Sequence, residues 1–209
     1  MLPPLQSSVK QSIHIWIAVF LLLTVALIFL VNKTTAQAYE QLVPHHTKWL
    51  DVFFTWFTYL GDGIFILLVA VVFLVRKYKW QGIAIIVSYA VSGVVAQTLK
   101  FFFPSPRPAV FYRNLGLPFY EIPGVTLMHS TASFPSGHTA SAFALMGILV
   151  LLWPSSKWNG LWCILAVAVG YSRIYLGNHF LVDVVAGAAI GIITACTTVF
   201  VINRFLNKQ

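Results

Sequence analysis

Six long apolar runs dominate the sequence and decide what kind of fold the chain can adopt. They occupy residues 15–31, 56–75, 82–103, 139–153, 161–176 and 181–202. A helix needs about 20 mostly apolar residues to cross a bilayer, whereas transmembrane barrels are built from shorter segments of alternating hydrophobicity. We therefore expect an all-α integral membrane bundle of six transmembrane helices, with residues 1–209 forming a single membrane-embedded domain.

The composition agrees with a membrane protein and excludes two other classes. Of the 209 residues, 59% are hydrophobic and 9% are charged, while a soluble domain carries about 25% charged residues. A disordered chain would combine low hydrophobicity with high net charge. The excess of 13 Lys and Arg over 5 Asp and Glu does not predict nucleic-acid binding, because the basic residues separate apolar runs and do not cluster on one solvated face.

The first apolar run has two possible interpretations. The small residues Ala36 and Ala38 after it are typical of a signal-peptidase site. The run itself is longer than the 7 to 15 residues, roughly, of the apolar part of a signal peptide. An uncleaved first helix is therefore the prediction, and a cleaved signal peptide is the alternative.

The distribution of cations predicts the orientation. An even number of helices places both termini on one side, and the cations on that side are Lys10, Arg76, Lys77, Lys79, Lys157, Arg204 and Lys208. The cations on the other side are Lys33, Lys48, Lys100, Arg107, Arg113 and Arg173, together with all five acidic residues. Lys100, Arg107 and Arg173 belong to a polar cluster, and setting them aside leaves seven cations against three. The positive-inside rule then predicts a protein of the inner, cytoplasmic membrane with cytoplasmic termini and a site that faces the periplasm or exterior.

Three short segments place this polar cluster at the outer ends of the last four helices. Its members are Lys100, Arg107, Ser136, Gly137, His138, Arg173, His179 and Asp183. Ser136 is suited to cap the fourth helix, which would leave the amides of Gly137 and His138 as an anion site at the helix N-terminus. Arg side chains offer forked donors that match phosphate oxygens. The segments therefore predict a phosphate site.

Two histidines in the cluster have the properties of catalytic groups. His179 and Asp183 are four residues apart, so their side chains can meet on one helix face. A carboxylate that holds one ring nitrogen leaves the other free as a nucleophile, and His138 is then the candidate general acid. No metal site or cofactor is expected, because the three cations would repel a divalent ion.

These segments resemble the signature of the type-2 phosphatidic acid phosphatase family. Its three parts, Lys-x6-Arg-Pro, Pro-Ser-Gly-His and Ser-Arg-x5-His-x3-Asp, are matched in order and without departure between Lys100 and Asp183. The resemblance implies a metal-independent phosphatase that acts through a phosphohistidine. It implies that His179 attacks phosphorus, that Asp183 orients it and that His138 protonates the leaving group. The phosphate would be held by Lys100, Arg107, Ser136, Gly137 and Arg173.

The expected reaction is hydrolysis of a lipid phosphate or diphosphate monoester at the outer membrane face. Polyprenyl diphosphate, phosphatidylglycerophosphate and phosphatidic acid are the substrate types considered, and the lipid bilayer is the expected partner. A lipid A phosphatase and a lipid phosphotransferase would carry the same site. A transporter of phosphorylated anions is the alternative from another class. The oligomeric state stays open.

Several other residues receive structural interpretations. His14, His45 and His46 have no motif around them, which predicts surface or interface positions, while His129 lies between two motif segments and is a candidate substrate contact. Arg113 is expected to anchor lipid headgroups.

The remaining features concern packing and the long outer loop. Cys163 and Cys196 lie within apolar runs and are expected to pack as small side chains. Gly187 and Gly191 form a small-xxx-small pattern that predicts close helix packing. The aromatic-rich loop 109–134 is interpreted as an interfacial lid, with a plain aromatic belt as the alternative.

Overall fold

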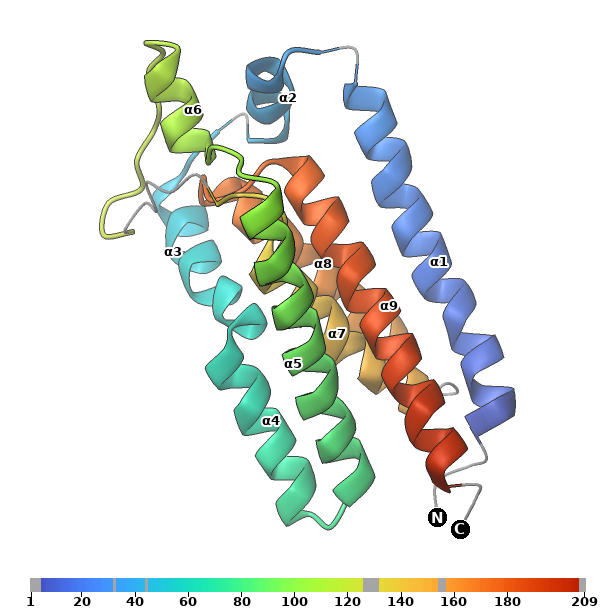
Figure 1. Ribbon diagram of the computed structural model, residues 1–209. Helices are drawn as coiled ribbons and strands as arrows, with labels where there is room; N and C mark the ends of the chain where they lie inside the picture. Colours follow the sequence, from blue (N-terminus) through green and yellow to red (C-terminus); the bar gives the residue numbers. More distant parts are fainter. Residues whose placement is uncertain (1–4, 32, 44, 126–131, 154–156, 207–209) are drawn as a thin grey trace.

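The regular secondary structure of the computed structural model is helical in the residues that it describes, apart from an isolated bridge between Ser105 and Ala132 (Figure 1). The described residues are 5–31, 33–43, 45–125, 132–153 and 157–206. Their helices are α1 (Leu5–Leu30), α2 (Thr35–Leu42), α3 (Lys48–Phe57), the 3-10 helix η1 (Thr58–Gly61), α4 (Gly63–Val75), α5 (Lys79–Phe102), α6 (Pro108–Asn114), α7 (Gly137–Leu152), α8 (Asn159–Tyr175) and α9 (Leu181–Leu206). The expected all-α class is confirmed for this part of the chain.

The helices differ in how well they fit a membrane span. Helices α5 and α9 are long and apolar enough to cross a membrane alone, and the pair formed by α3–η1 and α4, bent by 52°, would provide a third crossing. The apolar stretches His14–Ile28 of α1 and Gly137–Leu152 of α7 are shorter. The count of six spans therefore stays a prediction.

The second apolar run contains a helix break where one continuous helix was predicted. Asp62 has an extended backbone with φ −80° and ψ 147°, and its Oδ1 atom accepts a hydrogen bond of 2.8 Å from the amide of Ile64. An N-cap residue needs this non-helical backbone, so the preceding helix ends and α4 starts anew. The prediction of one helix over residues 56–75 is wrong for this reason.

Helix α7 forms the core of the bundle. All of its residues from Thr139 to Leu152 are buried, as expected for a helix that is apolar on every side. Helix α9 approaches it closely, since a Cβ atom at Gly187 or Gly191 would lie 2.5 Å from a backbone oxygen at the start of α7. The predicted small-residue packing is confirmed, and it holds the start of α9 against the start of α7.

A second cluster of buried side chains includes Tyr39 of α2 and Tyr112 of α6. These two helices lie at one end of the bundle in Figure 1. The turn between α4 and α5 and the end of α9 lie at the opposite end. Tyr112 and Phe119 from the loop 109–134 pack against Tyr39 of α2, with ring centroids 5.8 Å and 5.9 Å from the Tyr39 ring. These aromatic side chains are therefore part of a packed layer, while the idea of a lid stays a prediction.

Candidate active site

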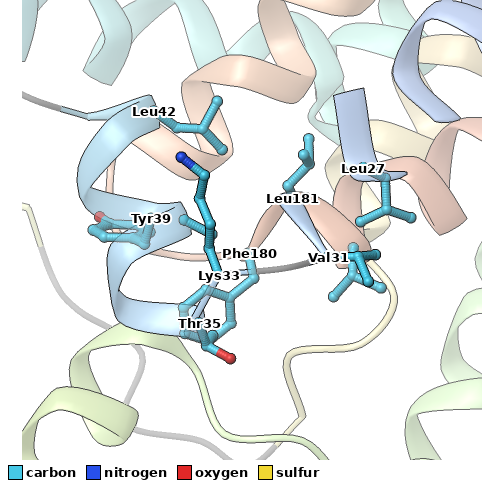
Figure 2. Close-up of a pocket in the computed structure, with 10 residues that line it drawn as sticks. Leu27, Val31, Lys33, Thr35, Tyr39, Leu42, Phe180 and Leu181 are labelled. Atoms are coloured by element: carbon cyan, nitrogen blue, oxygen red, sulfur yellow. The ribbon is translucent and has the colours of Figure 1, made fainter. Parts of the chain in front are cut away.

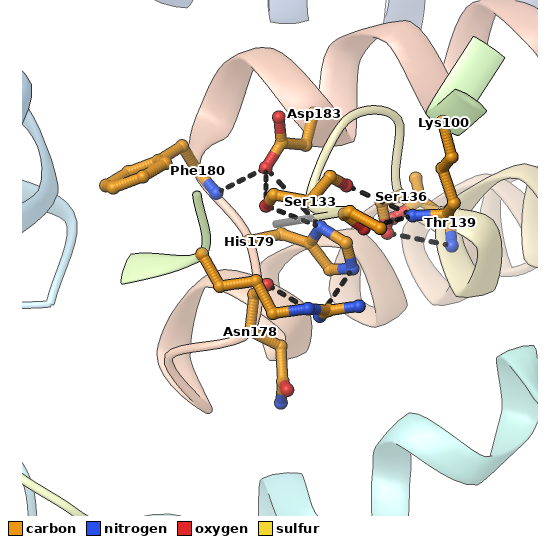
Figure 3. Close-up of polar contacts among 10 residues, drawn as sticks. Lys100, Ser133, Ser136, Thr139, Asn178, His179, Phe180 and Asp183 are labelled. Carbon is orange, nitrogen blue, oxygen red and sulfur yellow. Dashed lines mark hydrogen bonds and ion pairs between the residues drawn. The ribbon is translucent and has the colours of Figure 1, made fainter. Parts of the chain in front are cut away.

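The three motif segments meet at this same end of the bundle. Lys100 comes from the last turn of α5 and Arg107 precedes α6, while Ser136 precedes α7. Arg173 ends α8, and Asp183 lies in the first turn of α9. His179 lies in the turn between those two helices and not within the helix as expected. Figure 3 shows the polar contacts that connect these segments.

His179 and Asp183 are in contact, and a serine joins them. The His179 Nδ1 atom lies 3.4 Å from Asp183 Oδ2. The Ser133 hydroxyl donates to the same oxygen at 2.6 Å and lies 3.4 Å from the same ring nitrogen. The amide of Phe180 donates to Asp183 Oδ2 at 3.0 Å. The carboxylate is thus fixed by several donors and can hold a proton on Nδ1 of His179 (Figure 3).

The other ring nitrogen of His179 faces a cation. Arg107 is 6% exposed, and its Nη1 atom lies 3.5 Å from His179 Nε2 while donating to the backbone oxygen of Asn178 at 2.9 Å. Burial lowers the pKa of His179 to about 3, although the hydrogen bond with Asp183 acts in the opposite direction. The ring is therefore neutral near pH 7. A proton on Nδ1, held by Asp183, would leave the Nε2 lone pair on the side of Arg107.

The start of α7 has the features of an anion site. The Ser136 hydroxyl accepts hydrogen bonds from the Thr139 amide at 3.4 Å and from the Thr139 hydroxyl at 2.8 Å, which confirms Ser136 as the N-cap. A Cβ atom placed on Gly137 would meet nothing within 4 Å. The side of Gly137 where a Cβ atom would lie is therefore open.

Two of the predicted cations are held by neighbouring segments. The Lys100 ammonium donates to the backbone oxygens of Ala132 at 2.8 Å and Ser133 at 3.2 Å. The Arg173 guanidinium donates from Nη1 to the Thr58 hydroxyl at 2.7 Å. Its Nε atom is buried without a hydrogen-bond partner among the described residues. Both cations retain donor capacity beyond these contacts.

His138 has a partner, Asp62, outside the motif segments. Its Nε2 atom lies 3.8 Å from Asp62 Oδ2, and the two side chains are 31% and 32% exposed. Ser133, Asn178 and Thr58 also contact predicted site residues and were not predicted. Asp62 could have been considered, because it is one of five acidic residues that were all expected on the outer side. Ser133 belongs to none of the motif segments, so the sequence gives no reason to select it. The candidate contact His129 lies outside the described residues.

Metal-ligating side chains do not gather in the described part of the chain: no group of three His, Cys, Asp or Glu residues there could hold an ion.

A pocket of about 230 Å³ lies at Phe180, the residue that follows His179, and is lined mainly by apolar side chains together with Lys33 and Thr35 (Figure 2). Leu27 and Val31 line it from the end of α1, Tyr39 and Leu42 from α2, and Phe180 and Leu181 from the start of α9. Phe180 connects the two regions, because its side chain lines the pocket while its amide binds Asp183.

Comparison with known proteins defines the family. The PAP2 superfamily model matches residues 81–206, a range that contains all eight predicted site residues. The chain belongs to the PAP2 superfamily.

Two relatives and one solved structure make this similarity concrete. The chain is 40% identical over 81 residues to a bacitracin transport permease protein of Bacillus licheniformis, covering 37% of this chain and 39% of the relative. It is 30% identical over 134 residues to an undecaprenyl-diphosphatase of Sulfolobus acidocaldarius, covering 64% and 61%. The matches thus span less than two thirds of these relatives. The crystal structure of Aquifex aeolicus LpxE aligns with a TM-score of 0.65 and 30% identity, covering 79% of this chain and 94% of that one.

Proposed function

We propose that the protein is a membrane lipid phosphatase that hydrolyses a lipid phosphate or diphosphate monoester through a phosphohistidine. The observation that carries this proposal is the unequal environment of the two His179 nitrogens. Nδ1 faces Asp183 at 3.4 Å, while Nε2 faces the Arg107 guanidinium at 3.5 Å. A neutral imidazole with one nitrogen held and the other directed at a cation is arranged to attack an anion bound by that cation.

The proposed reaction has two half-reactions. The Nε2 atom of His179 attacks the terminal phosphorus, and the bond from this phosphorus to the leaving oxygen breaks. That oxygen belongs to the lipid alcohol in a monophosphate and to the lipid phosphate in a diphosphate, and His138 gives a proton to it. Water then attacks the phosphohistidine while His138 takes a proton from it, which releases inorganic phosphate and restores His179. Asp183 holds the Nδ1 proton and stabilises the positive charge on the ring in both steps.

The proposed phosphate ligands surround this position. In this proposal Arg107 and the amides at Gly137 would supply donors to the phosphate, and the N-cap Ser136 would keep those amides at the positive end of α7. Lys100 and Arg173 add positive charge, which suits a phosphoryl group that carries about two negative charges. These roles need no metal ion.

The apolar surroundings favour a lipid as the substrate. The pocket beside Phe180 would take part of a hydrocarbon tail while the headgroup reaches His179. We propose a single domain of six spans, with cytoplasmic termini in the inner membrane and the site at the outer face. The charge distribution along the chain supports this orientation.

Phosphate release in detergent tests the function. Polyprenyl diphosphate, phosphatidylglycerophosphate, phosphatidic acid and lipid A would be supplied with EDTA to the wild type and to His179→Ala. We expect one lipid class to be hydrolysed by the wild type only. An acid-labile, base-stable phosphoprotein should form in rapid-quench samples and be missing in the variant. Equal activity in the two proteins, or activity that needs a divalent metal, would contradict the proposal. Transfer of phosphate to an added lipid acceptor would identify a phosphotransferase.

The pocket can be tested separately. Ala38→Trp fills it, and should raise KM for a long-chain lipid phosphate about 10-fold because several methylene contacts are lost. The kcat/KM value for the soluble substrate 4-nitrophenyl phosphate should be unchanged. Leu22→Trp, at a 67% exposed position on α1, is the matched control. An unchanged KM for long chains in Ala38→Trp would exclude a tail in this pocket.

Transport of a phosphorylated anion is the second candidate, because the Bacillus licheniformis relative is named as a transport permease. This candidate predicts uptake of labelled anion into proteoliposomes without release of phosphate. Retention of that uptake in His179→Ala would favour it over the phosphatase.

A further inference from the structure

The break between α3 and α4 brings three residues against the candidate site. The Thr58 hydroxyl accepts the hydrogen bond from Arg173 at 2.7 Å. Gly61 packs so closely that a Cβ atom there would lie 2.7 Å from the backbone oxygen of His138. Asp62 follows directly, with its Oδ2 atom 3.8 Å from His138 Nε2. This segment lies outside the range that the family model matches.

The carboxylate of Asp62 is fixed in place by the helix that it caps. Its Oδ1 atom accepts the hydrogen bond from the Ile64 amide at 2.8 Å, which leaves Oδ2 to face the His138 ring. Because the backbone of Gly61 also contacts the first turn of α7, the distance between the carboxylate and the ring is set by two independent packing contacts. The pair is therefore built into the fold and does not depend on a mobile side chain.

Folding alone does not explain a negative charge at position 62. Asn caps a helix as well as Asp does, so the cap needs no carboxylate. The two side chains are 32% and 31% exposed, and an ion pair this accessible to solvent adds little to stability. What the charge does provide is a counterion for an imidazolium at His138.

We propose that Asp62 is a positioning residue for the general acid His138. The carboxylate orients the ring and favours its protonated form, which must be present before the lipid oxygen leaves. When the bond from phosphorus to oxygen breaks, the proton moves from the His138 ring to the leaving oxygen. The ring is then neutral until it takes a proton from the water that attacks the phosphohistidine, and Asp62 again offsets its charge.

The inference rests on the proposed function and assigns each histidine its own aspartate. Asp183 serves the nucleophile His179 and Asp62 serves the acid His138. The two aspartates come from different elements, the start of α9 and the break before α4. Only Asp183 is part of the sequence signature.

Comparing two substrates with different leaving groups distinguishes a positioning role of Asp62 from a purely structural one. Dodecyl phosphate releases an alkoxide, which needs a proton. A nitrophenyl phosphate monoester with a dodecyl chain on its ring releases a phenolate, which needs none. General acid catalysis contributes about 10²–10⁴-fold, so Asp62→Asn should lower kcat/KM for dodecyl phosphate by roughly 10-fold. The value for the nitrophenyl ester should change by less than about twofold, since that step makes little use of a general acid. The variant keeps the cap of α4.

Coupling to His138 completes the experiment. His138→Ala should show the same dependence on leaving group, and adding Asp62→Asn to it should cause no further loss, because the two residues act as one unit. Equal losses for both esters would mean that Asp62 acts through phosphate binding at Arg173 or through folding, and would overturn the proposal. An additive loss in the double variant, or no loss at all, would also overturn it. Failure of the proposed function is distinguishable, because the wild type would then release no phosphate from either ester.

Discussion

Two of the histidine–aspartate pairs in the described part of the chain are built very similarly. His179 Nδ1 lies 3.4 Å from Asp183, and His46 Nδ1 lies 3.2 Å from Asp51. Both carboxylates are buried and both accept a short hydrogen bond from a hydroxyl, 2.6 Å from Ser133 at Asp183 and 2.7 Å from Tyr175 at Asp51. By local geometry alone either pair could activate a histidine.

The surroundings of the two pairs differ, and this difference indicates their roles. The second nitrogen of His179 faces the Arg107 guanidinium. His46 instead packs on rings, with centroids 4.4 Å from Tyr120 and 4.7 Å from Tyr175. The Asp51 pair thus ties α3, α8 and the loop at Tyr120 together. A histidine–aspartate contact becomes a candidate catalytic site only where cations and free amides can bind an anion beside it.

The largest difference in activity is expected between variants in which His179 or His46 is replaced. His179→Ala should lower phosphate release by roughly 10³-fold or more, because the nucleophile is lost. His46→Ala should keep activity within about twofold, since its neighbours are structural. Initial rates on the lipid hydrolysed by the wild type measure both. A comparable loss in the two variants would refute the division of roles.

Replacing Asp183 or Asp51 should show the same difference in activity as replacing the histidines, but the loss should be smaller. Asp183→Asn leaves a side chain of the same size but removes the charge that stabilises the His179 ring, so kcat should fall about 10²-fold or more. Asp51→Asn is the matched control and should lower kcat by less than about twofold, as expected away from the reacting atoms. Single-turnover formation of the phosphoprotein measures this step directly. A slow step in Asp51→Asn with normal kinetics in Asp183→Asn would reverse the assignment.

The comparison also shows what the sequence can and cannot predict. The i, i+4 spacing predicted the contact of His179 with Asp183, and residue type predicted the Ser136 cap. The environment of His46 was not predictable, because Tyr175 is 124 residues from Asp51 and meets it only through tertiary packing. The side chain of His46 is 16% exposed and lies against Tyr120 and Tyr175, which is the interface position among the two that were expected.

The break at Asp62 is a different case, since its signal was present in the sequence. Asp62 stands between Gly61 and Gly63, and glycines flanking a capping residue are typical of a helix boundary. The apolar character of the surrounding run concealed this signal.

Substitutions around the Asp51 pair should affect stability more than activity. Tyr175 is 1% exposed, and Tyr175→Phe removes the 2.7 Å hydrogen bond to the buried Asp51 carboxylate. Removing a hydrogen-bond donor from a buried acceptor lowers the free energy of unfolding by about 1–3 kcal/mol. Thermal unfolding in detergent should therefore shift to lower temperature. Val169→Ala, which removes buried methyl groups of α8 from another part of the core, provides a comparison for an ordinary packing loss.

The smallest effect is expected for Tyr120, the exposed hydrogen-bond partner of Asp51. Tyr120 also donates to Asp51, at 3.2 Å, but it is 52% exposed. Water can replace its hydroxyl in Tyr120→Phe, and the ring still stacks on His46, so the unfolding temperature should equal that of the wild type. Limited proteolysis of the loop should be slightly faster, because one contact that ties it to α3 is lost. An unfolding temperature as low as that of Tyr175→Phe would mean that the loop and the core at Asp51 unfold as one unit.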